Sequence, residues 1–186
     1  GRTFSLLVVG VFEFGFINLY GTEITAAIEL EKAHKDNELL LLNILPGSIA
    51  DRLKSGEGLI ADRFDDMSVL FADVVGFTQM SKNMSPSALV EMLNTVFSMF
   101  DSIADKYNLE KIKTIGDAYM IAGGIGVDGR GHAENMADMG LEMLDLLAGY
   151  RDRTGIDIQV RVGIHMGPAV AGVVGLKKFI YDVWGD

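Results

Sequence analysis

The sequence predicts an α+β fold of the ferredoxin-like, palm-type class, a sandwich of a mostly antiparallel sheet with helices, preceded by a long N-terminal helix. Two patterns carry this prediction: a nearly continuous apolar run at 68–75, and an order of strand, long helix, hairpin, helix and strand after it. With 186 residues, 49% of them hydrophobic, the chain can hold one compact domain and an appendage.

The N-terminal part differs in composition from the rest. Residues 1–20 are largely apolar and slightly short for a membrane crossing, so we expect the end of a transmembrane helix or, alternatively, a buried or partner-packed helix. Residues 21–56 favour a helical connector, with Thr22 as its cap and Pro46 as its stop. A heptad seam fits Ala27, Leu30, His34, Asn37, Leu41 and Ile44. This seam predicts a dimeric coiled coil, with a solvated linker helix as the alternative.

Residues 57–186 form the main predicted domain. Because the 68–75 run is almost wholly apolar, its strand is expected to be covered on both faces. Ser85-Pro86 opens a helix that runs to Tyr107, and Gly116-Asp117 forms the tight turn of a hairpin at 110–123. The remaining predicted elements are a glycine-rich loop through Gly131, a helix over 132–150, and strands over 156–164, 169–174 and 178–183.

Composition excludes several classes of protein. A net charge of −10 and the lack of a long basic run argue against a nucleic-acid partner. The absence of cysteine excludes disulfides, thiolate catalysis and cysteine-bound metals, and it fits a reducing compartment. His34, His132 and His165 show no metal-ligand spacing and are expected to be ordinary surface or turn residues.

Two aspartates lie at positions that are typical of a catalytic site. Asp73 interrupts the first strand, and Asp117 lies in the hairpin turn that should neighbour this strand. A buried carboxylate is costly without a cation or several donors, and hard oxygen ligands suit Mg²⁺ or Mn²⁺ together with substrate phosphates. Gly76-Phe77-Thr78 follows at once and offers backbone N–H groups to a phosphate. The sequence therefore predicts a two-metal nucleotide enzyme.

Four motifs extend this prediction: FADVVGFT at 71–78, EKIKTIGDAYM at 110–120, RVGIHMG at 161–167 and YDVWGD at 181–186. In their order and spacing, the stretch from about Leu39 to Asp186 resembles class III nucleotide cyclase catalytic domains, most closely bacterial membrane-linked adenylate cyclases. The resemblance implies that Asp73, Asp117 and the Val74 carbonyl bind two divalent cations. It also implies that Arg161 contacts the triphosphate.

The same resemblance places Lys113 and Asp182 at the purine edge. Adenine presents an acceptor at N1 and donors on its amino group, which suits a lysine that only donates and an aspartate that only accepts. Guanine presents these groups in the reverse order, so ATP is expected over GTP. The implied reaction is attack of the ribose 3′-hydroxyl on the α-phosphorus, which yields 3′,5′-cyclic AMP and pyrophosphate.

The resemblance further implies a head-to-tail homodimer with two active sites at its interface. One subunit would supply Asp73, Asp117 and Arg161, and the other would supply Lys113 and Asp182. The catalytic domain would lie in the cytoplasm, tethered to the membrane through its N-terminus, while the connector relays signals by changing how the two subunits meet.

The family pattern continues with an asparagine, an arginine and a lysine beyond Asp186, where this chain ends. Because each preorganised charge contributes about two to three orders of magnitude to the rate, we expect this C-terminally truncated polypeptide alone to be weakly active or inactive. Its sheet edge is also expected to be uncovered. The alternative is a catalytically dead, cyclase-like domain that dimerises and binds nucleotide for regulation. A diguanylate cyclase ranks lower, because its acidic glycine-glycine hairpin motif is missing.

Overall fold

The computed structural model describes residues 14–42, 44–125, 131–175 and 178–185. By its backbone contacts the chain divides into two compact units, one ending at Lys54 and one beginning at Ser55. The two units are treated separately below.

The first unit contains helices α1 (Phe14–Leu42) and α2 (Gly47–Lys54). Thr22 lies inside α1, so its prediction as a helix cap was wrong: the helical stretch begins earlier, in the apolar run. Pro46 does separate the two helices, because proline disfavours helical geometry in the residue before it. Leu30, a residue of the predicted coiled-coil seam, is 67% exposed in the single chain. The coiled coil itself stays a prediction.

Among the helices of the described ranges, no segment is both long enough and apolar enough to cross a membrane. Most of the predicted transmembrane stretch, residues 1–13, lies outside the described residues.

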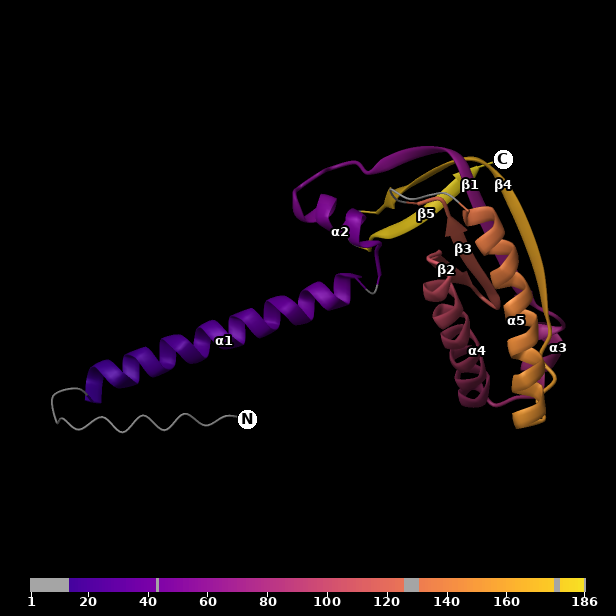
Figure 1. Cartoon of the computed structure of the whole chain (residues 1–186). Helices are drawn as coiled ribbons and strands as arrows, with labels where there is room; N and C mark the ends of the chain where they lie inside the picture. Colours follow the sequence, from indigo (N-terminus) through magenta and orange to yellow (C-terminus); the bar gives the residue numbers. More distant parts are fainter. Residues whose placement is uncertain (1–13, 43, 126–130, 176–177, 186) are drawn as a thin grey trace. The chain divides into compact units, whose positions relative to one another are not determined.

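The second unit is built on one five-stranded sheet with the order β2-β3-β1-β4-β5, in which every neighbouring pair is antiparallel. Its strands are β1 (Ala61–Val74), β2 (Glu110–Ile115), β3 (Ala118–Gly123), β4 (Val160–Val174) and β5 (Ile180–Gly185). Its helices are α3 (Phe77–Lys82), α4 (Pro86–Lys106) and α5 (His132–Thr154) (Figure 1). The predicted α+β class is therefore confirmed.

Helices α4 and α5 lie side by side and pack their apolar residues on one face of the sheet (Figure 1). On β1 this face carries Leu70, Ala72 and Val74, each at most 2% exposed. The opposite face, called the open face below, carries Phe71 and Asp73, and Phe71 is 42% exposed. The expectation that this strand is covered on both faces was wrong. Apolar side chains point to both faces, but the two helices cover only one of them.

The predicted strand at 169–174 and residues 160–164 of the one predicted at 156–164 belong to the single strand β4 (Val160–Val174), whereas residues 156–159 are not in a strand. Proline cannot donate to the ladder, so Pro168 inside a strand requires a local change in the pairing. The structure provides this change with a bulge in β1: Phe64 pairs with Ala169 and Met67 with Gly167, so two residues of β1 stand opposite Pro168. A bulge on one strand thus keeps the other strand continuous.

Local signals at the helix and hairpin ends are confirmed. Ser85 caps α4, since its side chain accepts a hydrogen bond from the Ala88 N–H at 3.2 Å. Gly116 adopts a φ of 63° in the hairpin turn, a conformation that favours glycine. Helix α5 continues to Thr154, beyond the predicted end at residue 150. Of the glycine-rich loop, residues 126–130 lie outside the described residues.

Candidate functional site

Asp73 and Asp117 come from neighbouring strand ends. Asp73 is the second-last residue of β1, and its cross-strand partner on β3 is Ala118. Asp117 directly precedes Ala118 in the hairpin turn. The register therefore brings both aspartates to one corner of the sheet, which is the placement that the sequence predicts.

The Asp73 side chain is 38% exposed and pairs with Arg161, its cross-strand partner on β4. The Arg161 Nη2–H donates to Asp73 Oδ2 at 2.5 Å. Arg161 is itself 74% exposed, so its side chain has room to turn away from the carboxylate. In this structure the Arg161 guanidinium is therefore the cationic partner of Asp73.

The residue types present fit a divalent cation site. Within the described part of the chain, no group of three or more histidine, aspartate or glutamate side chains is arranged to hold a metal ion. Mg²⁺ commonly binds through one or two carboxylates and completes its shell with water and substrate phosphates. A pair of aspartates at one corner of the sheet therefore suits an ion that arrives with a nucleotide, more than a permanent structural metal.

Lys113 and Asp182 meet although they belong to β2 and β5, the two outer strands of the sheet. The Lys113 ammonium donates to Asp182 Oδ2 at 2.5 Å, so the sheet curls enough to bring its two edges together (Figure 1). The other carboxylate oxygen of Asp182 accepts the Val183 N–H at 2.9 Å, which fixes the orientation of the group. The two side chains are only 31% and 16% exposed. The structure thus places one hydrogen-bond donor and one acceptor side by side, both partly shielded from solvent.

The curled open face encloses a hollow of about 350 Å³ beside this pair. Its lining residues are mostly apolar and come from β1, β3, β4 and β5: Met67, Val69, Phe71, Met120, His165, Gly167, Pro168, Ala169, Val183, Trp184 and Gly185. Met120 is the cross-strand partner of Lys113, and Val183 follows Asp182. The hollow is thus lined by neighbours of the pair, while Lys113 and Asp182 are not themselves among its lining residues.

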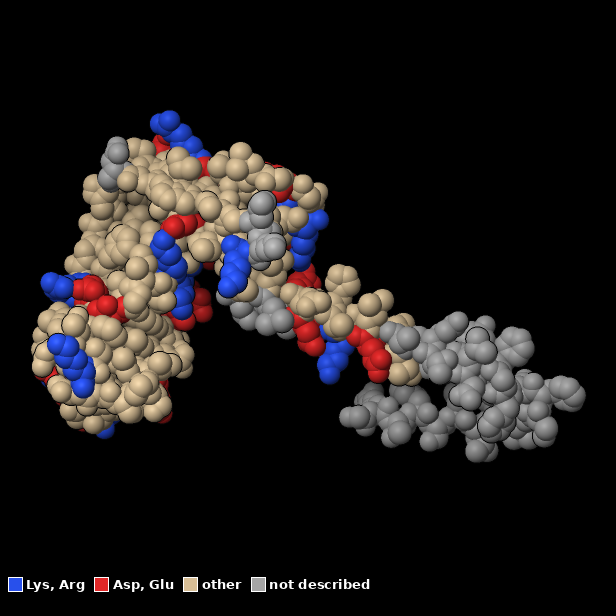
Figure 2. Space-filling model, turned by 180° about the vertical axis from the view of Figure 1, so that it is seen from behind, with Lys and Arg blue, Asp and Glu red and all other residues tan. Residues whose placement is uncertain are grey.

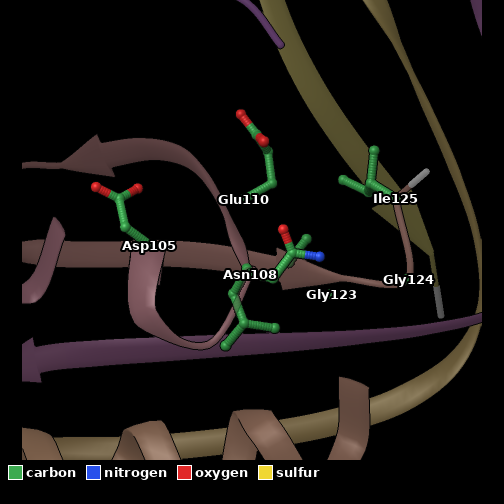
Figure 3. Close-up of a pocket in the computed structure, with 8 residues that line it drawn as sticks. Asp105, Asn108, Glu110, Gly123, Gly124 and Ile125 are labelled. Carbon is green, nitrogen blue, oxygen red and sulfur yellow. The ribbon is translucent and has the colours of Figure 1, made fainter. Parts of the chain in front are cut away.

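A second, polar hollow of about 200 Å³ lies at the other end of the hairpin, where β2 begins and β3 ends. Figure 3 shows the carboxylates of Asp105 and Glu110 on the same side of it. Burial, and next the charge of Asp105, raise the pKa of Glu110 above its ordinary value. Two carboxylates at one hollow oppose the binding of phosphates, so this place is a poor nucleotide site.

On the face shown in Figure 2, acidic and basic side chains lie in small groups with uncharged surface between them. Such a surface lacks the continuous basic stripe with which proteins bind nucleic-acid backbones. That this protein has no nucleic-acid partner stays a prediction.

Sequence reasoning missed a buried polar link beneath the first strand. Ser68 is fully buried, and its Oγ lies 2.8 Å from His132 Nδ1 at the start of α5. His132 is therefore a buried packing residue, not the surface or turn residue that was expected. His165 lines the apolar hollow on the open face. No signal in the sequence indicated the hollow, because Met67, Val69, Leu70 and Phe71 are all apolar and show no alternation.

A family model described as "Adenylate and Guanylate cyclase catalytic domain" matches residues 59–186. Among curated proteins, an adenylate cyclase of Mycobacterium tuberculosis is 46% identical over 158 residues, which cover 84% of this chain and 36% of that protein. A membrane guanylyl cyclase of Dictyostelium discoideum is 43% identical over 158 residues, covering 84% of this chain and 11% of that protein. The chain thus spans only about a third of the length of the first of these relatives.

Solved structures agree with this match. The adenylyl cyclase CyaB from P. aeruginosa has a TM-score of 0.62 and 28% identity, with 67% of both chains covered. A dimeric guanylyl cyclase domain of the RhoGC fusion protein from Blastocladiella emersonii has a TM-score of 0.63 and 28% identity, with 68% of this chain and 71% of that chain covered. Adenylyl and guanylyl cyclases are therefore both among the solved structures that are similar to this chain.

Proposed function

Because the chain belongs to the family of adenylate and guanylate cyclase catalytic domains, we propose that it acts on ATP and forms 3′,5′-cyclic AMP and pyrophosphate. Relatives named for adenylate and for guanylyl cyclisation are almost equally similar to it, at 46% and 43% identity. The choice of base must therefore be argued from the site.

The observation that carries the choice of ATP is the contact between Lys113 and Asp182. At 2.5 Å, with the carboxylate held by a backbone N–H, the pair is a donor and an acceptor in fixed order. Adenine offers N1 to a donor and its amino group to an acceptor, so both side chains are matched. Guanine would place an N–H and a carbonyl oxygen in the reverse order, which leaves partly buried polar groups unpaired.

The phosphate end is assigned to the corner of the sheet that carries the two aspartates. Asp73, Asp117 and the Val74 carbonyl would hold two divalent cations, Mg²⁺ or Mn²⁺. When bound, such ions lower the pKa of the attacking hydroxyl and hold the triphosphate in line. Arg161 would leave Asp73 for the triphosphate, since its exposed side chain can follow the larger negative charge. The backbone N–H groups of 76–78, at the turn into α3, would bind phosphate oxygens.

We further propose a homodimer with the open face at its interface. Phe71 is 42% exposed there in the single chain, and Trp184, which lines the hollow, is 46% exposed. A second copy would cover them and bring its own Lys113 and Asp182 to the first copy's aspartates. The N-terminal helix would tether the catalytic unit to the cytoplasmic side of a membrane.

The first test uses the full-length protein with Mg²⁺ or Mn²⁺ and compares the formation of cyclic AMP with that of cyclic GMP. Asp73→Ala should lower the cyclisation rate by at least about 100-fold, since a lost metal ligand removes several kcal/mol of charge stabilisation. The matched control is Asp65→Ala, because Asp65 lies on the same strand and also pairs with an arginine, Arg63, at 3.1 Å. Undiminished activity in Asp73→Ala would refute the metal assignment.

The alternative, a catalytically dead regulatory domain, binds nucleotide but needs neither aspartate. It would be supported if the unaltered full-length protein bound ATP and formed no cyclic nucleotide with either metal. Faster turnover of GTP than of ATP would instead retain the enzyme and overturn the choice of base.

Mixing two inactive variants tests the homodimer. In the proposed arrangement, Asp73→Ala spoils one half of each site and Asp182→Ala spoils the other half. A mixed dimer then keeps one intact site, so random mixing should restore about one quarter of the original activity. If each site were built within a single chain, the mixture would stay inactive.

A further inference from the structure

Lys111 and Lys113 lie two residues apart on β2, yet they point to opposite faces of the sheet. Residues opposite each other in an antiparallel pair share a face. Lys111 pairs with Ile121, which is buried in the core under the helices, whereas Lys113 pairs with Met120, which lines the hollow on the open face. In a regular strand, residues two apart share one face.

A β-bulge at Ile112 explains the difference. The register runs from Lys111 opposite Ile121 to Lys113 opposite Met120, so Ile112 is the extra residue between them. Without the bulge, Lys113 would stand opposite Tyr119, whose side chain is buried in the helix-covered core. A slip of one residue would therefore turn Lys113 away from Asp182.

The residue before the bulge is anchored to α4. The Lys111 ammonium lies 2.8 Å from the Asp101 carboxylate and 5.3 Å from the centre of the Tyr119 ring. The Tyr119 hydroxyl donates to the same carboxylate at 2.6 Å. Asp101 thus joins β2 and β3 to the helix at one point, on the side of the sheet away from the hollow.

From this arrangement we propose that Lys111 is a positioning residue for purine recognition. Its contacts with Asp101 and Tyr119 hold the bulged register, and this register places Lys113 on the open face, from which its ammonium reaches Asp182. Lys111 itself lies on the other face of the sheet from the base. The inference rests on the proposed function, because it presupposes that Lys113 reads the base.

The test measures kcat and KM of the full-length protein for ATP and for GTP. Lys111→Met keeps most of the side-chain length and removes the charge. We expect it to lower the ratio of kcat/KM for ATP to that for GTP by about fivefold, mainly through a higher KM for ATP, which is the scale of one partly exposed ion pair. Lys111→Arg keeps the contact with Asp101 and should restore the ratio. Amide hydrogen exchange at Lys113 and Thr114 should be faster in Lys111→Met.

Lys106→Met is the matched control, since Lys106 on α4 makes a similar ion pair that joins α4 to Glu142 on α5 and not to the hairpin. It should leave the ratio unchanged, whereas general destabilisation would affect both purines alike. Lys113→Met distinguishes the positioning role of Lys111 from the base-reading role of Lys113. If Lys113→Met changes the ratio and Lys111→Met does not, the positioning role is overturned while the base-reading role stands. If Lys113→Met leaves the ratio unchanged, the base-reading role fails and this inference falls with it.

Discussion

Replacing Tyr119 with phenylalanine tests how firmly the hairpin is held. Tyr119 is fully buried, with its ring centre 5.5 Å from that of Phe97 and 5.6 Å from that of Phe100. Its hydroxyl donates to Asp101 Oδ1 at 2.6 Å. Burial, and next this hydrogen bond, raise the pKa of Tyr119 far above its ordinary value, so the hydroxyl stays a donor. The hairpin that carries both Lys113 and Asp117 is tied to α4 through this contact.

Phenylalanine keeps the ring and its packing, so the change removes one hydrogen bond to a charged acceptor. Such a bond contributes about 1.5–3 kcal/mol to the free energy of unfolding. The lower value applies, because the Asp101 side chain is 42% exposed and keeps Lys111 and water as partners. For a chain of this size, about 1.5 kcal/mol corresponds to a fall in Tm of about 3–6 °C.

The assay is thermal unfolding followed by circular dichroism at neutral pH. Tyr107→Phe is the control: Tyr107 is only half-buried, unlike Tyr119, and its hydroxyl donates to Glu142 at 2.8 Å, so the loss should stay under about 1 kcal/mol. If Tyr119→Phe lowers Tm no more than Tyr107→Phe does, the reasoning is refuted. A double-mutant cycle with Asp101→Asn should show coupling, since both changes remove the same contact.

Two further predictions concern stability. Gly172→Ala should lower Tm markedly, because the added Cβ would lie 2.5 Å from the Ile60 carbonyl oxygen. Gly163→Ala is the control and should leave Tm nearly unchanged, since nothing lies within 4 Å of its Cβ. Equal effects of the two changes would contradict the close contact between the strands. Burial and the charge of Asp105 raise the pKa of Glu110, so the charged form of Glu110 destabilises the fold. This destabilisation grows as the pH rises from the ordinary pKa of glutamate to the raised pKa in the folded protein. Glu110→Gln should therefore raise Tm at pH 8, with the gain vanishing below about pH 4, where the glutamate is already protonated; a gain independent of pH would contradict this.

Features that depend on a few adjacent residues could be predicted from the sequence. Ser85-Pro86 predicts a helix start because a side-chain acceptor and a preset φ act within one turn. Gly116 predicts the hairpin turn because glycine adopts its φ of 63° without the steric cost that most other residues incur. The order of these elements then predicts the antiparallel sheet, and its topology places Asp73 beside the residue that follows Asp117.

Features that depend on which face is covered could not be predicted. Residues 68–75 are apolar except for Ser68 and Asp73, and only the packing of α4 and α5 decides that Leu70 is buried while Phe71 lines a hollow. The sequence predicts two separate strands at 156–164 and 169–174, and only the bulge in the neighbouring strand lets β4 continue through Pro168.

The amino-acid sequence by itself determined the class of fold, the caps and turns, and the two positions at which carboxylates interrupt apolar segments, since all of these follow from short-range periodicity and backbone preference. The tertiary structure alone decided that the two outer strands curl together until Lys113 meets Asp182, and that the bulge at Ile112 turns two nearby lysines to opposite faces. The physical reason is that strand curvature and register arise from contacts between residues far apart in the chain, and short-range sequence patterns carry no information on such contacts.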